Sequence, residues 1–115
     1  MESKAFLKAA RVSPQKARLV AALIRGRDVE EAIEVLTFAR KKSAPLFKCL
    51  VESAVANAEH SAKQKNQELD IDELVVKTVL VNEGPVLRRW RPRARGMATK
   101  ILKRTSHLTV VLANE

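Results

Sequence analysis

The chain has 115 residues, of which 46% are hydrophobic, and a formal net charge of +9, so it allows one domain with a small core. No apolar run is long enough to span a bilayer, no signal-peptide pattern is present, and the single cysteine excludes an internal disulfide. Residues 1–27 carry seven bases and one acid, residues 28–83 seven bases and eleven acids, and residues 84–114 eight bases and no acid. This segregation favours a body with one solvated face and one face turned toward a polyanion.

The first predicted elements are a strand and a helix. Residues 4–12 alternate loosely and predict a short strand with Phe6 on its apolar face. Ser13-Pro14 is typical of a helix start, because serine caps the helix and proline at its first position lacks only an amide that has no partner. The apolar spacing that follows predicts a helix ending at Gly26.

Two more helices are predicted in the acidic middle of the chain. Asp28 begins the second helix, with Glu31 as its capping-box partner. Ser43 caps a third and longer helix, whose buried stripe repeats every three to four residues from Phe47 onward. We expect this helix to fray at residues 63–67, which are all polar.

The remaining elements are strands. Residues 74–81 are rich in β-branched side chains and apolar on both faces, which predicts a strand at an inner position under the helices. Residues 101–102 and 108–112 predict the returning strand. The fold class is therefore α+β, with three helices packed on a small antiparallel sheet of about three strands and a long protruding β-hairpin. We expect one domain over residues 1–115, with a hairpin arm at approximately 83–104.

The arm is the most unusual stretch of the sequence. From Gly84 to Gly96 it holds five arginines and one tryptophan, and it contains no carboxylate. Like charges repel and the apolar content is small, so this stretch cannot build a core of its own and needs an anionic partner. With a tip near residues 91–96, each side of the arm has roughly ten residues, which would carry the tip about 30 Å from the body. The guanidinium fork matches phosphate oxygens and its plane stacks on bases, so a nucleic acid is the expected partner.

Trp90 lies between two of these arginines and leaves two interpretations open. It either packs on a neighbour within the hairpin, or it stacks on a base or on an arginine plane.

Catalytic chemistry finds little support. His60 and His107 have no partner at metal-ligand spacing, and no glycine-rich phosphate loop is present. Cys49 sits beside apolar residues in the third helix, which favours a core or boundary cysteine over a nucleophile. We therefore predict no enzymatic activity, no metal and no cofactor.

Several motifs, in order along almost the whole chain, make the sequence resemble the large-subunit ribosomal protein L-twenty-two family. The residues that carry this resemblance are Ser13-Pro14-Gln15-Lys16-Ala17-Arg18-Leu19-Val20, Ile24-Arg25-Gly26, Ser53-Ala54-Val55-Ala56-Asn57-Ala58-Glu59-His60, Glu83-Gly84-Pro85, Pro92-Arg93-Ala94-Arg95-Gly96 and Ile101-Leu102-Lys103-Arg104-Thr105-Ser106-His107.

The resemblance implies a structural constituent of the large subunit of cytoplasmic ribosomes that binds 23S ribosomal RNA and assists subunit assembly. It implies an α+β body near the peptide exit and a hairpin that runs inward to line the nascent-peptide tunnel, beside another ribosomal protein, L-four. The expected partners are thus 23S rRNA, neighbouring large-subunit proteins and the nascent polypeptide. The protein would be a monomer within the ribosome and would not contact a membrane.

The site residues follow from the arginine pattern and from the matching motifs. By resemblance, Ser13 to Arg18 hold an RNA-facing helix start, and Lys103 to His107 form the root of the hairpin. The predicted RNA-binding residues are Ser13, Gln15, Lys16, Arg18, Arg25, Arg88, Arg89, Arg91, Arg93, Arg95, Lys100, Lys103, Arg104, Thr105, Ser106 and His107. The predicted tunnel-lining tip comprises Arg91, Pro92, Arg93, Ala94, Arg95, Gly96, Met97 and Ala98.

Two other functions fit parts of the pattern. The helix pair 14–24 and 28–39 is similar to a helix-turn-helix of a DNA-binding protein, although the acids of its second helix would repel phosphate. A small hydrolase could use Cys49 or His107. Neither alternative accounts for the arm.

Overall fold

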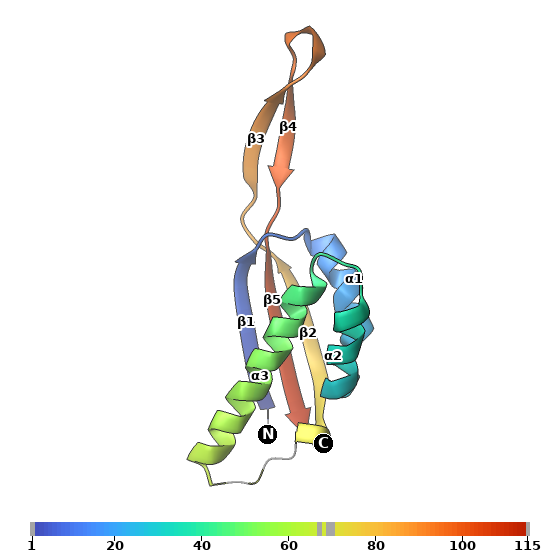
Figure 1. Ribbon diagram of the computed structural model, residues 1–115. Helices are drawn as coiled ribbons and strands as arrows, with labels where there is room; N and C mark the ends of the chain where they lie inside the picture. The colour runs from blue at the N-terminus through green and yellow to red at the C-terminus, as the bar shows by residue number, and fades with distance from the viewer. Residues whose placement is uncertain (1, 67, 69–70, 115) are drawn as a thin grey trace.

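The described residues of this computed structural model, 2–66, 68 and 71–114, form a body and an arm (Figure 1). Their helices and strands are β1 (Glu2–Ala10), α1 (Pro14–Ile24), α2 (Val29–Phe38), α3 (Ala44–Gln64), β2 (Leu74–Glu83), β3 (Leu87–Pro92), β4 (Ala98–Lys103) and β5 (Ser106–Asn114). The principal extents are 67 × 27 × 16 Å, and the arm accounts for much of the long axis. The α+β class, with three helices, a three-stranded antiparallel sheet and a further hairpin, is confirmed.

The body sheet has the strand order β1-β5-β2, with both pairs antiparallel. Across the sheet, Ala5 lies opposite Val110, and Val110 lies opposite Val79, so the three side chains share the face that meets the helices. The prediction that residues 74–81 take an inner position was wrong. The inner strand is β5, and β2 is an edge whose outer face leaves Leu80 exposed.

The free edge of β2 is covered by helix α1 and by the loop that follows it. The amide of Gly26 donates to the carbonyl of Val76 at 2.9 Å. The guanidiniums of Arg25 and Arg18 donate to two further β2 carbonyls, at 2.7 and 3.2 Å. These bonds satisfy carbonyl acceptors that an unprotected edge strand would leave open to pairing with a strand of another molecule. β2 is therefore an edge strand whose hydrogen-bonding edge is protected by α1 and its loop.

The expected apolar face of β1 was also wrong. Ala5 is buried, whereas Phe6 is 60% exposed on the outer face. A bulge between Leu7 and Ala10, with Ala9 at φ 56°, then shifts the register so that Ala10 is buried again. A simple alternation over residues 4–12 cannot place both ends of such a strand on the correct face.

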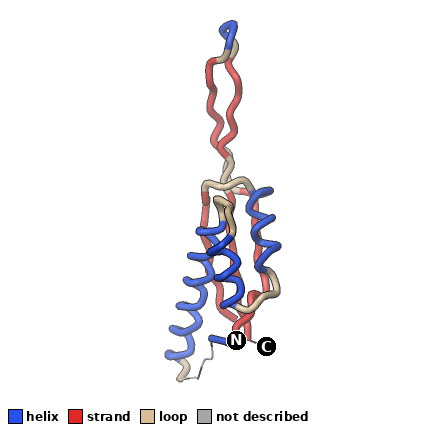
Figure 2. The backbone as a smooth tube through the Cα atoms, turned by 45° about the vertical axis from the view of Figure 1, so that its right-hand side comes forward, coloured by secondary structure: helices blue, strands red, loops and turns tan. Residues whose placement is uncertain are grey.

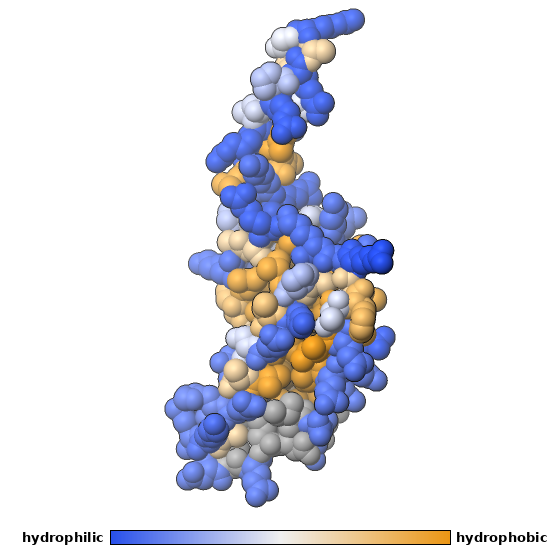
Figure 3. All heavy atoms as spheres, in the orientation of Figure 1, coloured by the Kyte–Doolittle hydropathy of each residue, from blue (hydrophilic) through white to orange (hydrophobic). Residues whose placement is uncertain are grey.

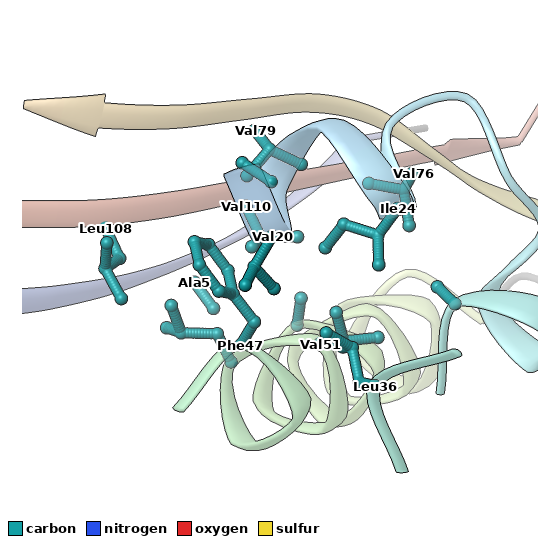
Figure 4. Packing of buried hydrophobic residues seen from close by; sticks show 14 of the residues in the cluster. Ala5, Val20, Ile24, Leu36, Phe47, Val51, Val76, Val79, Leu108 and Val110 are labelled. Carbon is teal, nitrogen blue, oxygen red and sulfur yellow. The ribbon is translucent and has the colours of Figure 1, made fainter. Parts of the chain in front are cut away.

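All three helices cover one face of the sheet (Figures 1 and 2). The core lies between them, and Phe47 and Val51 of α3 point toward Val20 of α1 and toward the sheet (Figure 4). Phe47 is fully buried and is the largest such side chain. The long helix is fixed to β1 by the Ser3 hydroxyl, which donates to the carbonyl of Ala54 at 2.6 Å.

The helix starts lie where the sequence predicts them, but the caps differ. Ser13, Asp28 and Ser43 occupy the three N-cap positions, and none of their side chains makes a capping hydrogen bond. The predicted capping box at Asp28 is therefore not formed. Helix α3 extends to Gln64 and so runs into the segment expected to fray.

Candidate nucleic-acid interface

The arm is a two-stranded ribbon formed by β3 and β4, separate from the body sheet (Figure 2). Its register pairs Arg89 with Ile101 and Trp90 with Lys100. Because opposite residues of an antiparallel pair share a face, one side of the ribbon holds Arg89 and the other holds Trp90. Arginines therefore project from both faces, since Arg88 lies on the Trp90 side.

Every residue from 88 to 100 is exposed. Hydrophilic side chains cover most of the arm, whereas hydrophobic side chains show on the body (Figure 3). Among the described residues, no carboxylate forms an ion pair with an arm cation. The predicted phosphate-contacting cations of the ribbon and tip are Arg88, Arg89, Arg91, Arg93, Arg95, Lys100 and Lys103. Their charges are available to an outside anion.

Trp90 is 65% exposed and lies opposite Lys100. It does not reach the body core, which consists of residues outside the arm. A large aromatic surface left in water next to cations can stack on an unpaired base. The geometry is compatible with both interpretations of Trp90, because the Lys100 stem can also cover one face of the ring.

The tip is a short turn closed by a backbone bond. The amide of Arg93 donates to the carbonyl of Met97 at 2.6 Å. Inside the turn, Arg95 and Gly96 both adopt left-handed backbone conformations, with φ of 64° and 69°. The predicted turn role of Gly96 is confirmed, since glycine adopts this region without strain.

The root of the arm corrects two of the predicted contact residues. Ser106 is fully buried, and its hydroxyl donates to the carbonyl of Val12 at 2.7 Å. Thr105 is also buried, and its Oγ1 donates to the carbonyl of Pro85 at 2.6 Å. Both hydroxyls are used inside the protein, so these two side chains position the arm and do not face a partner.

His107 lies on the outer face of β5 and is half-buried. Its Nδ1 accepts a hydrogen bond from the amide of Ala9 at 3.0 Å, and its ring lies 6.1 Å from that of Phe6. The neutral ring that accepts this bond carries its proton on Nε2. Nε2 is therefore the atom with which His107 can donate to an outside group.

Gly84 makes a close approach that fixes the two sides of the root. Its amide donates to the carbonyl of Thr105 at 3.0 Å. A Cβ built on Gly84 would lie 2.5 Å from the Thr105 hydroxyl oxygen. Only glycine allows these two segments of the chain to approach this closely. In the sequence, Gly84 stands out only as part of the Glu83-Gly84-Pro85 motif.

On the body, the predicted residues of α1 divide into two groups. Gln15 and Lys16 are exposed in the first turn, and their side chains make no hydrogen bond to the described part of the chain. Arg18 and Arg25 use one nitrogen each on β2. Since a guanidinium has five N–H donors, both arginines keep donors for an outside partner.

A cavity of about 810 Å³ brings together residues from both ends of the chain. Ser13, Lys16, Lys103 and Arg104, all predicted from sequence, line it. Three further cations, which the prediction missed, also line the cavity, namely Arg11, Lys41 and Lys42. In the sequence, Lys41 and Lys42 follow the second predicted helix. Their position immediately before the predicted start of the third helix was the signal in the sequence that could have placed them at the interface.

The opposite end of the body carries paired charge. Lys77 and Glu2 form a salt bridge at 2.5 Å, and the hydrogen bond from Lys77 lowers the pKa of the Glu2 carboxyl.

In the described residues no group of histidines, cysteines and acids could hold a metal ion. Cys49, expected in the core or at its boundary, is exposed, because it lies on the face of α3 away from Phe47 and Leu50. No described helix is both long and apolar enough to cross a membrane.

Comparison with known families gives one match that spans both regions of the molecule. The model of the family described as ribosomal protein L22p/L17e matches residues 5–113. The matched range includes the three helices and the whole arm.

Proposed function

The chain belongs to the ribosomal protein L22p/L17e family, whose members are structural, non-enzymatic proteins of the large ribosomal subunit in the cytoplasm, and on this premise we propose that it binds 23S ribosomal RNA. The arm supplies most of the contacts, and the cations of the α1 face supply the rest. The observation that carries the proposal is the arm itself, in which seven exposed cations have no described carboxylate partner. Folded RNA provides the phosphates that such a surface neutralises.

The second part of the proposal concerns the tip. A ribbon that projects from a compact body reaches a site that the body cannot enter. In the ribosome we place this tip, from Arg91 to Ala98, along the wall of the nascent-peptide tunnel. The body would remain near the tunnel exit, as a monomer among neighbouring large-subunit proteins, and its early binding to RNA would assist assembly.

A DNA-binding function is less well supported. Helices α1 and α2 follow one another as in a helix-turn-helix, but Glu30, Glu31 and Glu34 are all exposed on α2. A recognition helix with three carboxylates would repel the phosphates beside a groove.

RNA binding is tested by titrating the full chain with a 23S rRNA fragment and with a DNA duplex of equal length across a salt series. The fragment should bind tighter. Replacing Arg89 and Arg91 with glutamine should lower the salt slope by roughly 1.5, since each lost phosphate contact removes about 0.7 to 0.9. Matched glutamine variants of Lys63 and Lys65, at the far end of α3, should change neither affinity nor slope. Equal binding to DNA and RNA, or equal effects of the two variant pairs, would count against the proposal.

Tunnel placement needs a separate experiment. A photo-crosslinking residue at position 95, in ribosomes that carry a stalled nascent chain, should crosslink to that chain. The same residue at position 59, exposed on α3, should not. Crosslinks from position 95 to rRNA alone would leave RNA binding intact and exclude the tip from the path of the peptide.

A further inference from the structure

The cavity at the root of the arm has a cationic lining, which suits phosphates, and an aliphatic lining, which phosphates alone do not require. Six cations from three separate segments surround it, and no described lining residue is acidic. These cations are Arg11, Lys16, Lys41, Lys42, Lys103 and Arg104. None of them forms an ion pair or hydrogen bond with another described side chain. The cavity therefore concentrates positive charge that the protein itself does not neutralise.

Aliphatic side chains line the same space. Val12 is a buried lining residue, whereas Leu19 of α1 and Leu102 of β4, which also line the cavity, are 61% and 41% exposed. Two exposed leucines among six cations gain nothing from contact with phosphate. They provide an apolar surface of the kind that small-molecule sites use to hold a flat or bulky group.

A third feature is a polar group without a partner. Ser43 is only 4% exposed and lines the cavity, and its hydroxyl makes neither a capping bond nor any other bond to the described chain. No described side chain has a buried polar atom that lacks a partner, so the Ser43 oxygen is accessible from the cavity and can donate to a group bound there. Ser43 stands at the N-terminus of α3, where the helix dipole favours an anion, while the amide of Ala44 donates to the carbonyl of Lys41 and Pro45 has no amide hydrogen.

From these three features we propose that the cavity holds one unpaired nucleotide of RNA, extruded from its neighbours. Its base lies against Leu19 and Leu102, its two flanking phosphates meet the cations, and Ser43 donates to the nucleotide. A volume of about 810 Å³ is within the range of roughly 300 to 1,000 Å³ typical of small-ligand sites. Unpaired, splayed bases are also what proteins recognise most often in RNA. The inference rests on the proposed function and adds that this surface binds an unpaired nucleotide of the RNA.

The alternative is a site for phosphates only, and a matched pair of probes separates the two. The first probe is a single-stranded RNA trinucleotide, and the second is the same trinucleotide with its central base removed. Both carry the same charge. Titrations of the full chain, followed by amide NMR shifts, should show the intact trinucleotide binding about ten-fold tighter, because part of one base leaves water for aliphatic side chains. Equal affinities would overturn the nucleotide site.

Substitutions locate the effect. Leu102→Asn should abolish the preference for the intact trinucleotide while leaving affinity for the abasic one unchanged. Changing Lys41 and Lys42 to glutamine should weaken both probes equally and lower the salt slope by roughly 0.7, the share of one single-strand phosphate contact, because the other four cations remain. Leu80→Asn, an exposed leucine on the outer face of β2, is the matched control and should change neither affinity. Thermal unfolding of each variant checks that the body remains folded.

The outcomes also separate this inference from the proposed function. If Leu102→Asn has no effect, or if the NMR shifts fall outside the cavity, the nucleotide site is wrong, and binding to the 23S rRNA fragment stands on its own titration. If the trinucleotide behaves as expected but the rRNA fragment binds no tighter than duplex DNA, the cavity assignment stands and the wider function fails.

Discussion

The body and the arm are built from the same antiparallel pairing, but different forces hold them. In the body, opposite residues such as Ala5 and Val110 bury their side chains under the helices. In the arm, the pair Trp90 and Lys100 leaves both side chains in water. A two-stranded ribbon without a covered face is marginally stable by itself. The body is therefore stabilised by burial, whereas the arm depends on its register, its turn and its root.

This difference explains how one small chain can fold alone and still present a long charged surface. Because no arm side chain is needed for a core, its positions are free to carry cations on both faces. In the proposed complex with RNA, phosphates offset the cost of ordering those long side chains. On that proposal the arm's cations serve binding, and the body's apolar residues serve folding.

The largest expected effect comes from removing one aromatic from each region. Phe47→Ala should lower the free energy of unfolding by about 3 to 5 kcal/mol, the usual range for a buried phenylalanine. Trp90→Ala should stay within about 0.5 kcal/mol, as for exposed positions. Urea denaturation followed by far-UV circular dichroism measures both without relying on tryptophan fluorescence. A loss at Trp90 comparable to that at Phe47 would mean that the arm is part of the core.

The junction between the regions should show an intermediate effect. Gly84→Ala places a methyl group against the Thr105 hydroxyl and should cost about 1 to 3 kcal/mol. Thr105→Ala alone loses the bond to Pro85 and should cost about 1 kcal/mol. The double variant should cost less than the two together, because the clash then disappears. Additive values from the same denaturation experiments would show that the close approach does not constrain the root.

The comparison also separates what the sequence reveals from what it does not. The arm was predictable because its run of cations without carboxylates, and the turn at Gly96, can be recognised in the sequence without knowing how the chain packs. The helices were predictable from spacing and from Pro14. The strand order was not, since the apolar residues of 74–81 fit an inner strand as well as an edge protected by α1. That protection arises from contacts more than 50 positions apart.

The exposure of the candidate site residues was predictable where it followed from composition, and it was not predictable where tertiary structure decides it. Ser106 and Thr105 lie in a basic motif, yet the fold turns both hydroxyls inward. Lys41 and Lys42 lie far from that motif, yet the start of α3 brings them to the same cavity. No local pattern distinguishes a serine that binds the backbone of its own protein from one that faces an outside partner.

A smaller effect comes from two glycines, one in each region, that have the same left-handed backbone conformation. Gly26 and Gly96 have φ of 81° and 69°, and a Cβ at either would meet open space. Alanine at either position should therefore add only backbone strain, of about 1 kcal/mol. In Gly26→Ala this cost should appear in global unfolding. In Gly96→Ala it should appear only as faster amide exchange in β3 and β4, because the arm opens without the body. The same global loss in both variants would contradict independent opening.

The smallest effect concerns the ion pair between Glu2 and Lys77, at the end of the body away from the arm (Figure 1). Lys77 lowers the pKa of Glu2 below its ordinary value of 4.5, so the native state binds this proton less readily than the unfolded chain. The pair therefore contributes stability above pH 4.5 and loses it as the pH falls through the lowered native pKa. Glu2→Gln should be slightly less stable than the unmodified chain at neutral pH, and the two curves should converge under acid. Glu59→Gln, an exposed acid in no described ion pair, should show no such convergence. Because both partners are half-exposed, the difference should be small. A large difference would mean that surface charge contributes to the body's stability as much as burial does, and the contrast with the arm would weaken.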